Sequence, residues 1–126
     1  MTGVLLDSDV VIEVLRGRKA IVAALSALEA RGVATFTCGG VVAEILAGLR
    51  AGEGAATEAF FHTRGDIVID ATTGRRAGSY LARYARSHGV EIAAALVAAA
   101  AATTGLRLFT LNREHYPMRD VRFFDF

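Results

Sequence analysis

The sequence predicts an α/β fold: a parallel sheet of four or five short strands with helices covering both faces. Two observations support this prediction. Short apolar runs alternate with segments of helical periodicity along the whole chain. The apolar runs are also nearly continuous, as in strands that are buried on both faces of a sheet. A length of 126 residues suits one domain, and we expect residues 1–126 to form a single unit.

The predicted strands are short and rich in branched residues. Four of them, in chain order, occupy residues 3–7 (GVLLD), 33–38 (VATFTC), 66–70 (DIVID) and 106–111 (LRLFTL). The last six residues, 121–126 (VRFFDF), are a possible fifth strand. Each run has the length and β-branched content of a buried strand.

The predicted helices repeat apolar residues at helical spacing and stop at glycines, which end helices readily. They occupy residues 8–17, 19–32, 40–52, 72–89 and 90–105. The last of these contains VEIAAALVAAAAATTG, which has no polar side chain between Glu91 and Thr103. Such a run is expected to be a packing helix, unless a functional side chain has been lost from it.

Composition excludes several classes of protein. The chain is 53% hydrophobic and 21% charged, which excludes a disordered protein. No apolar run is long enough to cross a membrane, and the first residues lack the basic start of a signal peptide. The single cysteine, Cys38, cannot form an internal disulfide, which fits a reducing compartment, so we expect a cytoplasmic protein.

Polar residues follow two of the predicted strands. Asp7, Ser8 and Asp9 come after the first strand, and Thr110 and Asn112 come at the end of the fourth. In open α/β sheets the ligand site lies outside the carboxyl ends of the strands, so these side chains are expected to converge. Asp7 alone could equally cap the helix that follows it.

Glu44 is a lone acid in an apolar helical pattern, VVAEILAGL. A buried carboxylate without a partner costs several kcal/mol, so Glu44 either has a partner or metal or lies at an edge and reaches solvent. Together with Asp7 it could bind one hard cation through oxygen ligands.

The chain resembles the PIN-domain ribonucleases, and in particular the VapC-type toxins of bacterial toxin–antitoxin pairs. The resemblance rests on VLLDSDVVIEVLRG, CGGVVAEILAGL, HGVEIAAALVAAAAATTGLRLFTLN and REHYP, in the family's order and spacing. It implies a three-layer α/β/α fold and a Mg²⁺- or Mn²⁺-dependent endoribonuclease that cuts structured RNA of the tRNA or rRNA class. It also implies a homodimer and a cognate antitoxin that reaches the acidic pocket.

The resemblance carries roles to particular residues. Asp7 matches the family's first metal-binding Asp, with Ser8 the hydroxyl residue after it, and Glu44 matches the acid of the next motif. Asn112, with Thr110 before it, matches the last polar position of the site. These matches make Asp7, Glu44 and Asn112 the expected catalytic residues.

One position departs from the family pattern. In IAAALVAA, Ala94 stands where the family has a metal-binding Asp. The packing helix therefore has lost a carboxylate, and we expect the chain as written to be inactive. Glu91 could substitute if the helix began early, although a first-turn acid favoured by the helix dipole is the simpler interpretation. The alanine fits either a deliberately silenced toxin or a naturally inactive homologue.

RNA binding needs basic side chains near the acidic pocket. Arg113, next to Asn112, and Arg16, near the end of the first helix, are the candidates. A further basic stripe, at Arg75, Arg76, Arg83 and Arg86, also fits an ordinary solvated helix face. The net charge of +1 gives no general attraction to nucleic acid.

Two other functions remain open. The chain could be an inactive PIN module that binds RNA or its antitoxin without cleavage. VLLDSDVV also fits the start of a haloacid-dehalogenase-like phosphatase, and Asp70 with Thr110 faintly resembles a response-regulator receiver. Both of these need a lysine after a later strand, whereas the only lysine is Lys19, and the phosphatase needs a downstream acidic pair that the chain lacks.

Overall fold

The computed structural model describes all residues from Met1 to Phe126, and its centre is a sheet of four parallel strands. The strand order is β3-β2-β1-β4, so the first strand lies inside the sheet. The strands are β1 (Val4–Leu6), β2 (Thr35–Cys38), β3 (Gly65–Ile67) and β4 (Arg107–Phe109). The predicted parallel α/β sheet is confirmed.

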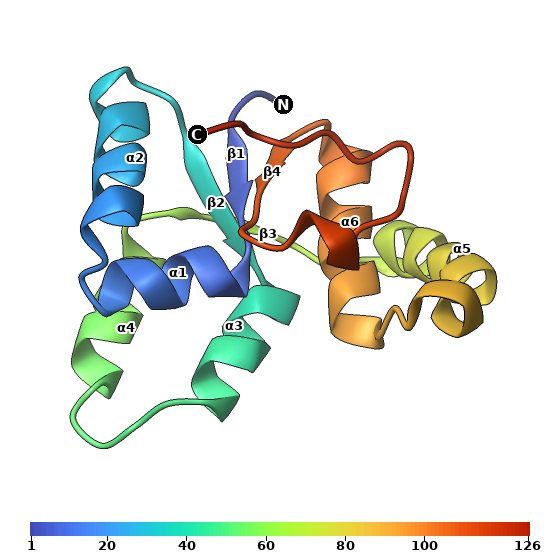
Figure 1. The fold of residues 1–126 in the computed structure, drawn as a ribbon, viewed down its shortest axis with the longest axis horizontal. Helices are drawn as coiled ribbons and strands as arrows, with labels where there is room; N and C mark the ends of the chain where they lie inside the picture. Colours follow the sequence, from blue (N-terminus) through green and yellow to red (C-terminus); the bar gives the residue numbers. More distant parts are fainter.

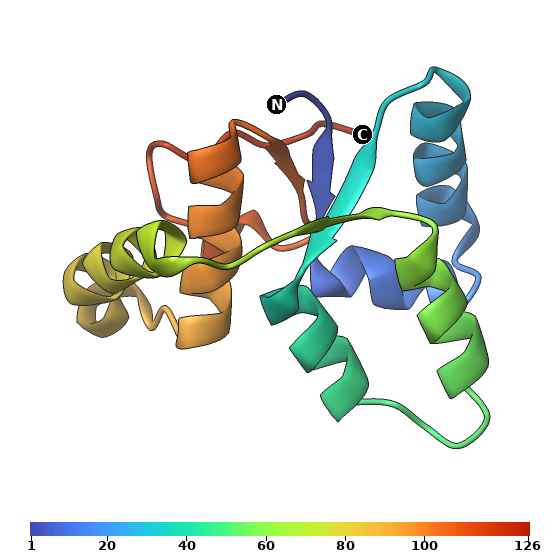
Figure 2. The same ribbon diagram turned by 180° about the vertical axis from the view of Figure 1, so that it is seen from behind.

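Six helices surround the sheet. They are α1 (Ser8–Leu15), α2 (Lys19–Ala30), α3 (Gly39–Ala47), α4 (Gly54–His62), α5 (Ala71–His88) and α6 (Ile92–Thr104). Helices α2 and α6 lie on opposite sides of the sheet (Figure 1), and the view from behind agrees (Figure 2). The predicted three-layer arrangement is therefore present.

The residues at the centre of the sheet are fully buried. Leu5 pairs with Phe36 of β2 on one side and with Leu108 of β4 on the other. Leu5 and Leu6 are both 0% exposed, because successive strand residues point to opposite faces and helices cover both. The residue that follows them is Asp7, so a buried apolar strand holds a carboxylate at its carboxyl end.

Helix α6 packs the alanine run into the core. Its residues from Val97 to Ala101 are at most 1% exposed. A Cβ placed on Gly40 of α3 would lie 3.6 Å from Val97 Cγ2, so small residues let α3 and α6 approach closely. The packing role predicted for this run is correct.

Four segment predictions need correction. Helix α4 was not predicted, and the helix expected over residues 40–52 ends at Ala47. The third strand ends at Ile67, and the expected continuation to residue 70 leaves the sheet. The possible fifth strand is reduced to one bridge between Leu108 and Phe123.

No helix combines the length and apolar character that a membrane crossing requires.

Candidate active site

The carboxyl ends of β1 and β2 lead directly into α1 and α3, below the sheet in Figure 1. A pocket of about 190 Å³ lies at this edge. Its lining residues are Asp7, Ser8, Asp9, Glu44, Ala94, Asn112, His115 and Tyr116. Six of the residues that the sequence singled out for a site, from four distant segments, thus meet in one place.

Asp7 is the most firmly held side chain of the pocket. It is 6% exposed, and its Oδ1 accepts a hydrogen bond of 2.8 Å from the backbone nitrogen of Ser8, so it also caps α1. Its Oδ2 accepts hydrogen bonds from Thr110 Oγ1 at 2.9 Å and from the Tyr116 hydroxyl at 2.7 Å. Three partners from three segments would oppose a change of its position. Asp7 can therefore both cap α1 and serve the pocket.

Thr110 lies behind the pocket and is not among its lining residues. Its hydroxyl oxygen is 2.9 Å from Asp7 Oδ2 and 3.4 Å from Asp9 Oδ2, and it accepts a hydrogen bond from the backbone nitrogen of Asn112. Thr110 therefore connects the end of β4 to the two carboxylates that follow β1.

Asp9 belongs to the pocket, as its position after the first strand predicted, but its role in the site was missed. Burial, and then the negative charge of Asp7, raises the pKa of Asp9 to about 6, against opposing hydrogen bonds such as that from the Leu111 nitrogen. Its Oδ1 is buried without a hydrogen-bond partner. The available signal was its position two residues after a strand end, in the first turn of α1.

Tyr116 was also missed. Its side chain is 5% exposed, and burial followed by the charge of Asp7 raises the pKa of its hydroxyl far above the ordinary value. The hydroxyl therefore stays protonated and donates to Asp7. The motif REHYP contained this tyrosine, but no sequence pattern indicated that it contacts Asp7, 109 positions away.

Glu44 is exposed, so the interpretation of a buried acid is wrong and the edge position is correct. Its Oε1 accepts a hydrogen bond of 3.4 Å from Ser8 Oγ, which keeps the carboxylate over the pocket. Partial desolvation, and then the charge of Asp7, raises the pKa of Glu44 above its usual range. Desolvation contributes most to the raised pKa of Glu44, and the neighbouring charge of Asp7 adds to it.

Ala94 presents a half-buried methyl group to the pocket, from the first turn of α6. Glu91 is the N-cap of that helix and does not line the Asp7 pocket itself. It lines a neighbouring pocket that shares Glu44, Ala94 and His115 with the Asp7 pocket.

Asn112 and His115 close the pocket on the side of β4. Asn112 Nδ2 lies 3.1 Å from His115 Nε2, while Asn112 Oδ1 is buried and has no hydrogen-bond partner. Two acceptor oxygens of the pocket, on Asp9 and Asn112, thus have no donor within the protein.

The two arginines expected to hold RNA lie outside this pocket. Arg113 forms an ion pair with Asp125, and its guanidinium lies 4.9 Å from the centre of the Phe123 ring. Arg16 caps the carboxyl end of α1 and lines a separate pocket with Ile12 and Ile45. Neither arginine contacts the acidic residues directly.

The oxygen atoms of the pocket are of the kind that binds a hard divalent cation, but few ligands are present. Carboxylates and amide oxygens are the ligands that Mg²⁺ prefers, and the two acceptors without donors could be satisfied by a cation or its waters. However, no group of three or more His, Cys, Asp or Glu side chains is arranged to hold a metal ion. Ala94 contributes only a methyl group to the lining of the same pocket.

The chain matches known proteins along most of its length. The PIN domain model matches residues 4–122. Ribonuclease VapC19 from Mycobacterium tuberculosis is 34% identical over 115 residues, covering 90% of this chain and 92% of that protein.

Solved structures with the same fold include complexes with a second protein. A toxin–antitoxin complex from Klebsiella pneumoniae has a TM-score of 0.74 at 19% identity, covering 94% of this chain and 95% of that one. A DNA-bound VapBC from Salmonella typhimurium has a TM-score of 0.82 at 19% identity, covering 99% and 98%. The phosphatase and receiver alternatives are not favoured. Asp70, which only the receiver interpretation would use, caps α5 by accepting a hydrogen bond from the Thr73 nitrogen.

Proposed function

Since this chain belongs to the PIN-domain family, as a VapC-type ribonuclease toxin of a toxin–antitoxin system, we propose that its reaction depends on a divalent cation held beside Asp7 and that Ala94 has silenced it. The observation that carries the proposal is the pocket itself. Acidic side chains from β1, α1 and α3 converge there, and a methyl group faces them from α6.

Mg²⁺ or Mn²⁺ is the proposed cation. Asp7 would hold it, with Glu44 and Asn112 as further direct or water-mediated ligands. When bound, such a cation lowers the pKa of water and neutralises negative charge on a phosphodiester. The raised pKa values of Asp9 and Glu44 support the proposal, because crowded carboxylates attract positive charge.

The chain's own residues position and transfer protons around this site. Thr110 and Tyr116 hold Asp7 Oδ2, so the carboxylate keeps one orientation when RNA arrives. Asp9, whose pKa is about 6, changes charge near neutral pH and can hold or release a proton. Glu44 faces solvent above the pocket, where it can orient an attacking water.

The alanine at position 94 accounts for the proposed loss of activity. A site that depends on several carboxylates loses both a ligand and a charge when one becomes a methyl group. The fold does not depend on this side chain, because alanine is the best helix former and α6 packs mostly through other alanines. We expect a folded protein with little or no nuclease activity.

The proposed partners follow from the relatives. We propose that a cognate antitoxin covers the acidic pocket, that the substrate is structured RNA of the tRNA or rRNA class, and that the protein acts in the cytoplasm as one PIN domain. The proposed RNA contacts of Arg113 and Arg16 would lie at the margins of the pocket, because neither side chain lines it.

The decisive experiment compares three proteins: the chain as written, Ala94→Asp and Ala94→Asn. Each is incubated with structured RNA in Mn²⁺ and in chelator. Ala94→Asp should cut RNA in Mn²⁺ only, whereas Ala94→Asn, which adds nearly the same volume without the charge, should stay inactive. Asp7→Asn in the Ala94→Asp background should abolish cleavage again. A folded Ala94→Asp protein that binds no metal and cuts nothing would contradict the proposal.

A further inference from the structure

A second pocket lies at the opposite edge of the sheet from the acidic one. It has a volume of about 520 Å³ and is formed at the amino ends of β1, β2 and β4. Its lining includes Gly3 and Val4 before and in β1, Val33 and Ala34 before β2, and Arg107 in β4. The strands separate this pocket from the Asp7 site, so it does not belong to that site.

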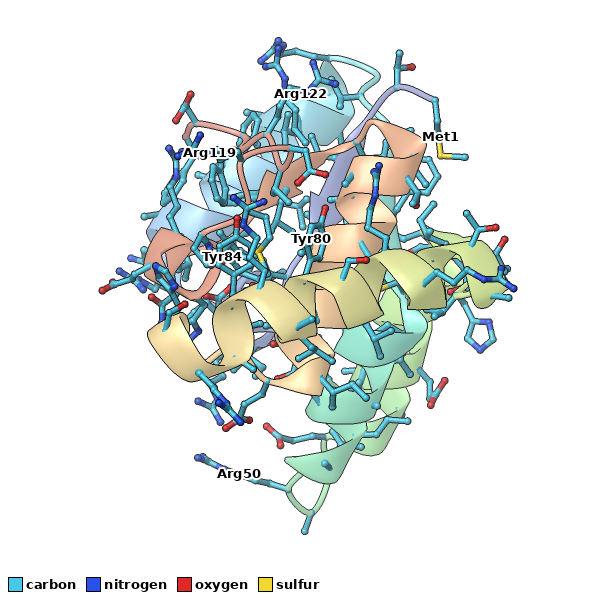
Figure 3. The ribbon with its side chains drawn as sticks, turned by 90° about the vertical axis from the view of Figure 1, so that its right-hand side faces the viewer. Met1, Arg50, Tyr80, Tyr84, Arg119 and Arg122 are labelled. Atoms are coloured by element: carbon cyan, nitrogen blue, oxygen red, sulfur yellow. The ribbon has the colours of Figure 1, made fainter.

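Three arginines line this pocket. Arg31 follows α2, Arg107 belongs to β4, and Arg122 lies in the carboxyl-terminal segment. All three are exposed, and none forms an ion pair. None of the 13 lining residues is an Asp or a Glu, so the pocket holds three positive charges and no acid to balance them. Figure 3 shows Arg122 at the same end of the molecule as Met1.

The negative ends of two helices offset only part of this positive charge. Helices α2 and α6 both finish at this edge, and Arg122 donates a hydrogen bond of 2.8 Å to the carbonyl oxygen of Gly105 after α6. The carboxyl end of a helix carries about half a negative charge, so two helix ends offset about one of the three guanidinium charges. About two positive charges stay unbalanced.

The arrangement suits a small anion better than a nucleic-acid strand. The arginines come from three separate segments around a hollow, whereas a polymer backbone is followed by a stripe of charge along a surface. The volume lies within the range of small-molecule sites. Phe124, whose ring packs at a tilt against Phe109, adds an aromatic side chain to the lining. A guanidinium group binds phosphate through paired hydrogen bonds.

We propose that this arginine pocket, lined by Arg31, Arg107 and Arg122, binds a small anion that carries two or more phosphate groups. The anion is either an inorganic polyphosphate or the polyphosphate of a nucleotide. Binding there is independent of the acidic pocket, and therefore of the proposed nuclease chemistry.

Calorimetry on the full chain tests the proposal with tripolyphosphate, a nucleoside triphosphate and the unphosphorylated nucleoside as ligands. Both phosphorylated ligands should bind and the nucleoside should not. Equal affinities indicate inorganic polyphosphate, and a tighter nucleoside triphosphate indicates a nucleotide. Arg31→Glu and Arg107→Glu should each weaken binding about tenfold or more, from the loss of charge-assisted hydrogen bonds.

Two control variants separate this site from the rest of the protein. Arg83→Glu makes the same charge change on the exposed surface of α5 and should leave binding unchanged. Asp7→Asn should also leave it unchanged, so a failure of the nuclease proposal would not affect the result. Arg31 lies outside the sheet, so its variant decides the question if Arg107→Glu does not fold. No binding of tripolyphosphate, or an equal loss in Arg83→Glu, overturns the proposal, as does binding that the Arg31 variant leaves intact.

Discussion

The hydroxyl of Tyr116 donates a hydrogen bond of 2.7 Å to Asp7 Oδ2, joining residues 109 positions apart. It connects the segment after the last strand to the end of the first strand. Because Asp7 is the proposed principal ligand of the cation, the tyrosine would position that ligand without touching the substrate.

Tyr116→Phe tests this positioning role. In the Ala94→Asp background, the change should lower the affinity for Mn²⁺ about tenfold, since residues that orient a metal ligand typically matter by that amount. It should also lower the free energy of unfolding by about 1–2 kcal/mol, because a buried hydrogen bond is lost. Isothermal titration with Mn²⁺ and urea denaturation measure the two effects.

Tyr80→Phe is the matched control for that experiment. The Tyr80 hydroxyl donates to the carboxylate of Asp120, away from the acidic pocket. Its removal should lower stability while leaving the affinity for Mn²⁺ unchanged. Equal losses of metal affinity in both variants would assign Tyr116 a merely structural role.

Asp9 should make the metal-free protein less stable as pH rises. The pKa of Asp9 is taken as the unperturbed 3.8 in the unfolded chain and is about 6 in the folded protein. Between these pH values the folded protein therefore binds a proton that the unfolded chain releases. Stability should therefore fall from about pH 4 to about pH 6 and level off above. The full shift corresponds to about 3 kcal/mol, and solvent screening of this partly exposed group reduces it to about 1 kcal/mol.

Asp9→Asn should remove most of that slope. Urea denaturation in chelator, at intervals from pH 4 to pH 8, would show the variant more stable than the parent above pH 6 and similar to it near pH 4. A parent whose stability rises over this interval would show that the carboxylate is not destabilised by its surroundings.

Divalent cations should stabilise Ala94→Asp more than the chain as written. A ligand that binds only the folded state stabilises it by RT ln(1 + [L]/Kd), so tighter binding at one ligand concentration gives a larger rise in melting temperature. In chelator the order should reverse, because a further carboxylate beside Asp7 and Asp9 adds repulsion. Differential scanning fluorimetry with Mn²⁺ and with chelator measures both; identical shifts for the two proteins would argue against a cation at position 94.

A homodimer remains a prediction. Val68, in the connection before α5, is 72% exposed, and Ile92, the first residue of α6, is 66% exposed. Contiguous exposed apolar patches often mark contacts with another protein, so these two side chains are the ones to test. Size-exclusion chromatography with light scattering should give the mass of two chains, and Val68→Glu with Ile92→Glu should shift it toward one. A monomer of the parent at high micromolar concentration would count against this assembly.

The sequence predicted those pocket residues that directly follow the end of a strand. Asp7 follows a run of apolar residues that can only be a buried strand, and parallel strands bring their carboxyl ends to one edge. Asp9 was expected at the same edge, but neither its role nor the participation of Tyr116 could be found in this way. Their roles depend on distances across the pocket, and a tyrosine after a 3₁₀ turn has no periodic pattern that points to a partner.

Segment ends were less predictable for a different reason. Helix α4 has a weak apolar pattern and is held partly by tertiary contacts: Arg64, which follows it, bonds to Glu29 at 2.7 Å and lies 3.6 Å from the centre of the Phe60 ring. The third strand leaves the sheet after Ile67 because its partner strand ends at Cys38. Such limits depend on neighbours rather than on local sequence.

The alanine packing of α6 also has a genetic consequence. Alanine and aspartate codons can differ at the second base alone, and the half-buried methyl of Ala94 faces a pocket rather than the core. The helix can therefore gain or lose its carboxylate through one point mutation without being repacked. Where the Ala94 codon ends in a pyrimidine, one base change would place an aspartate there. Under the proposed function, selection in a growing culture would then show how well an antitoxin protects the cell from the resulting nuclease.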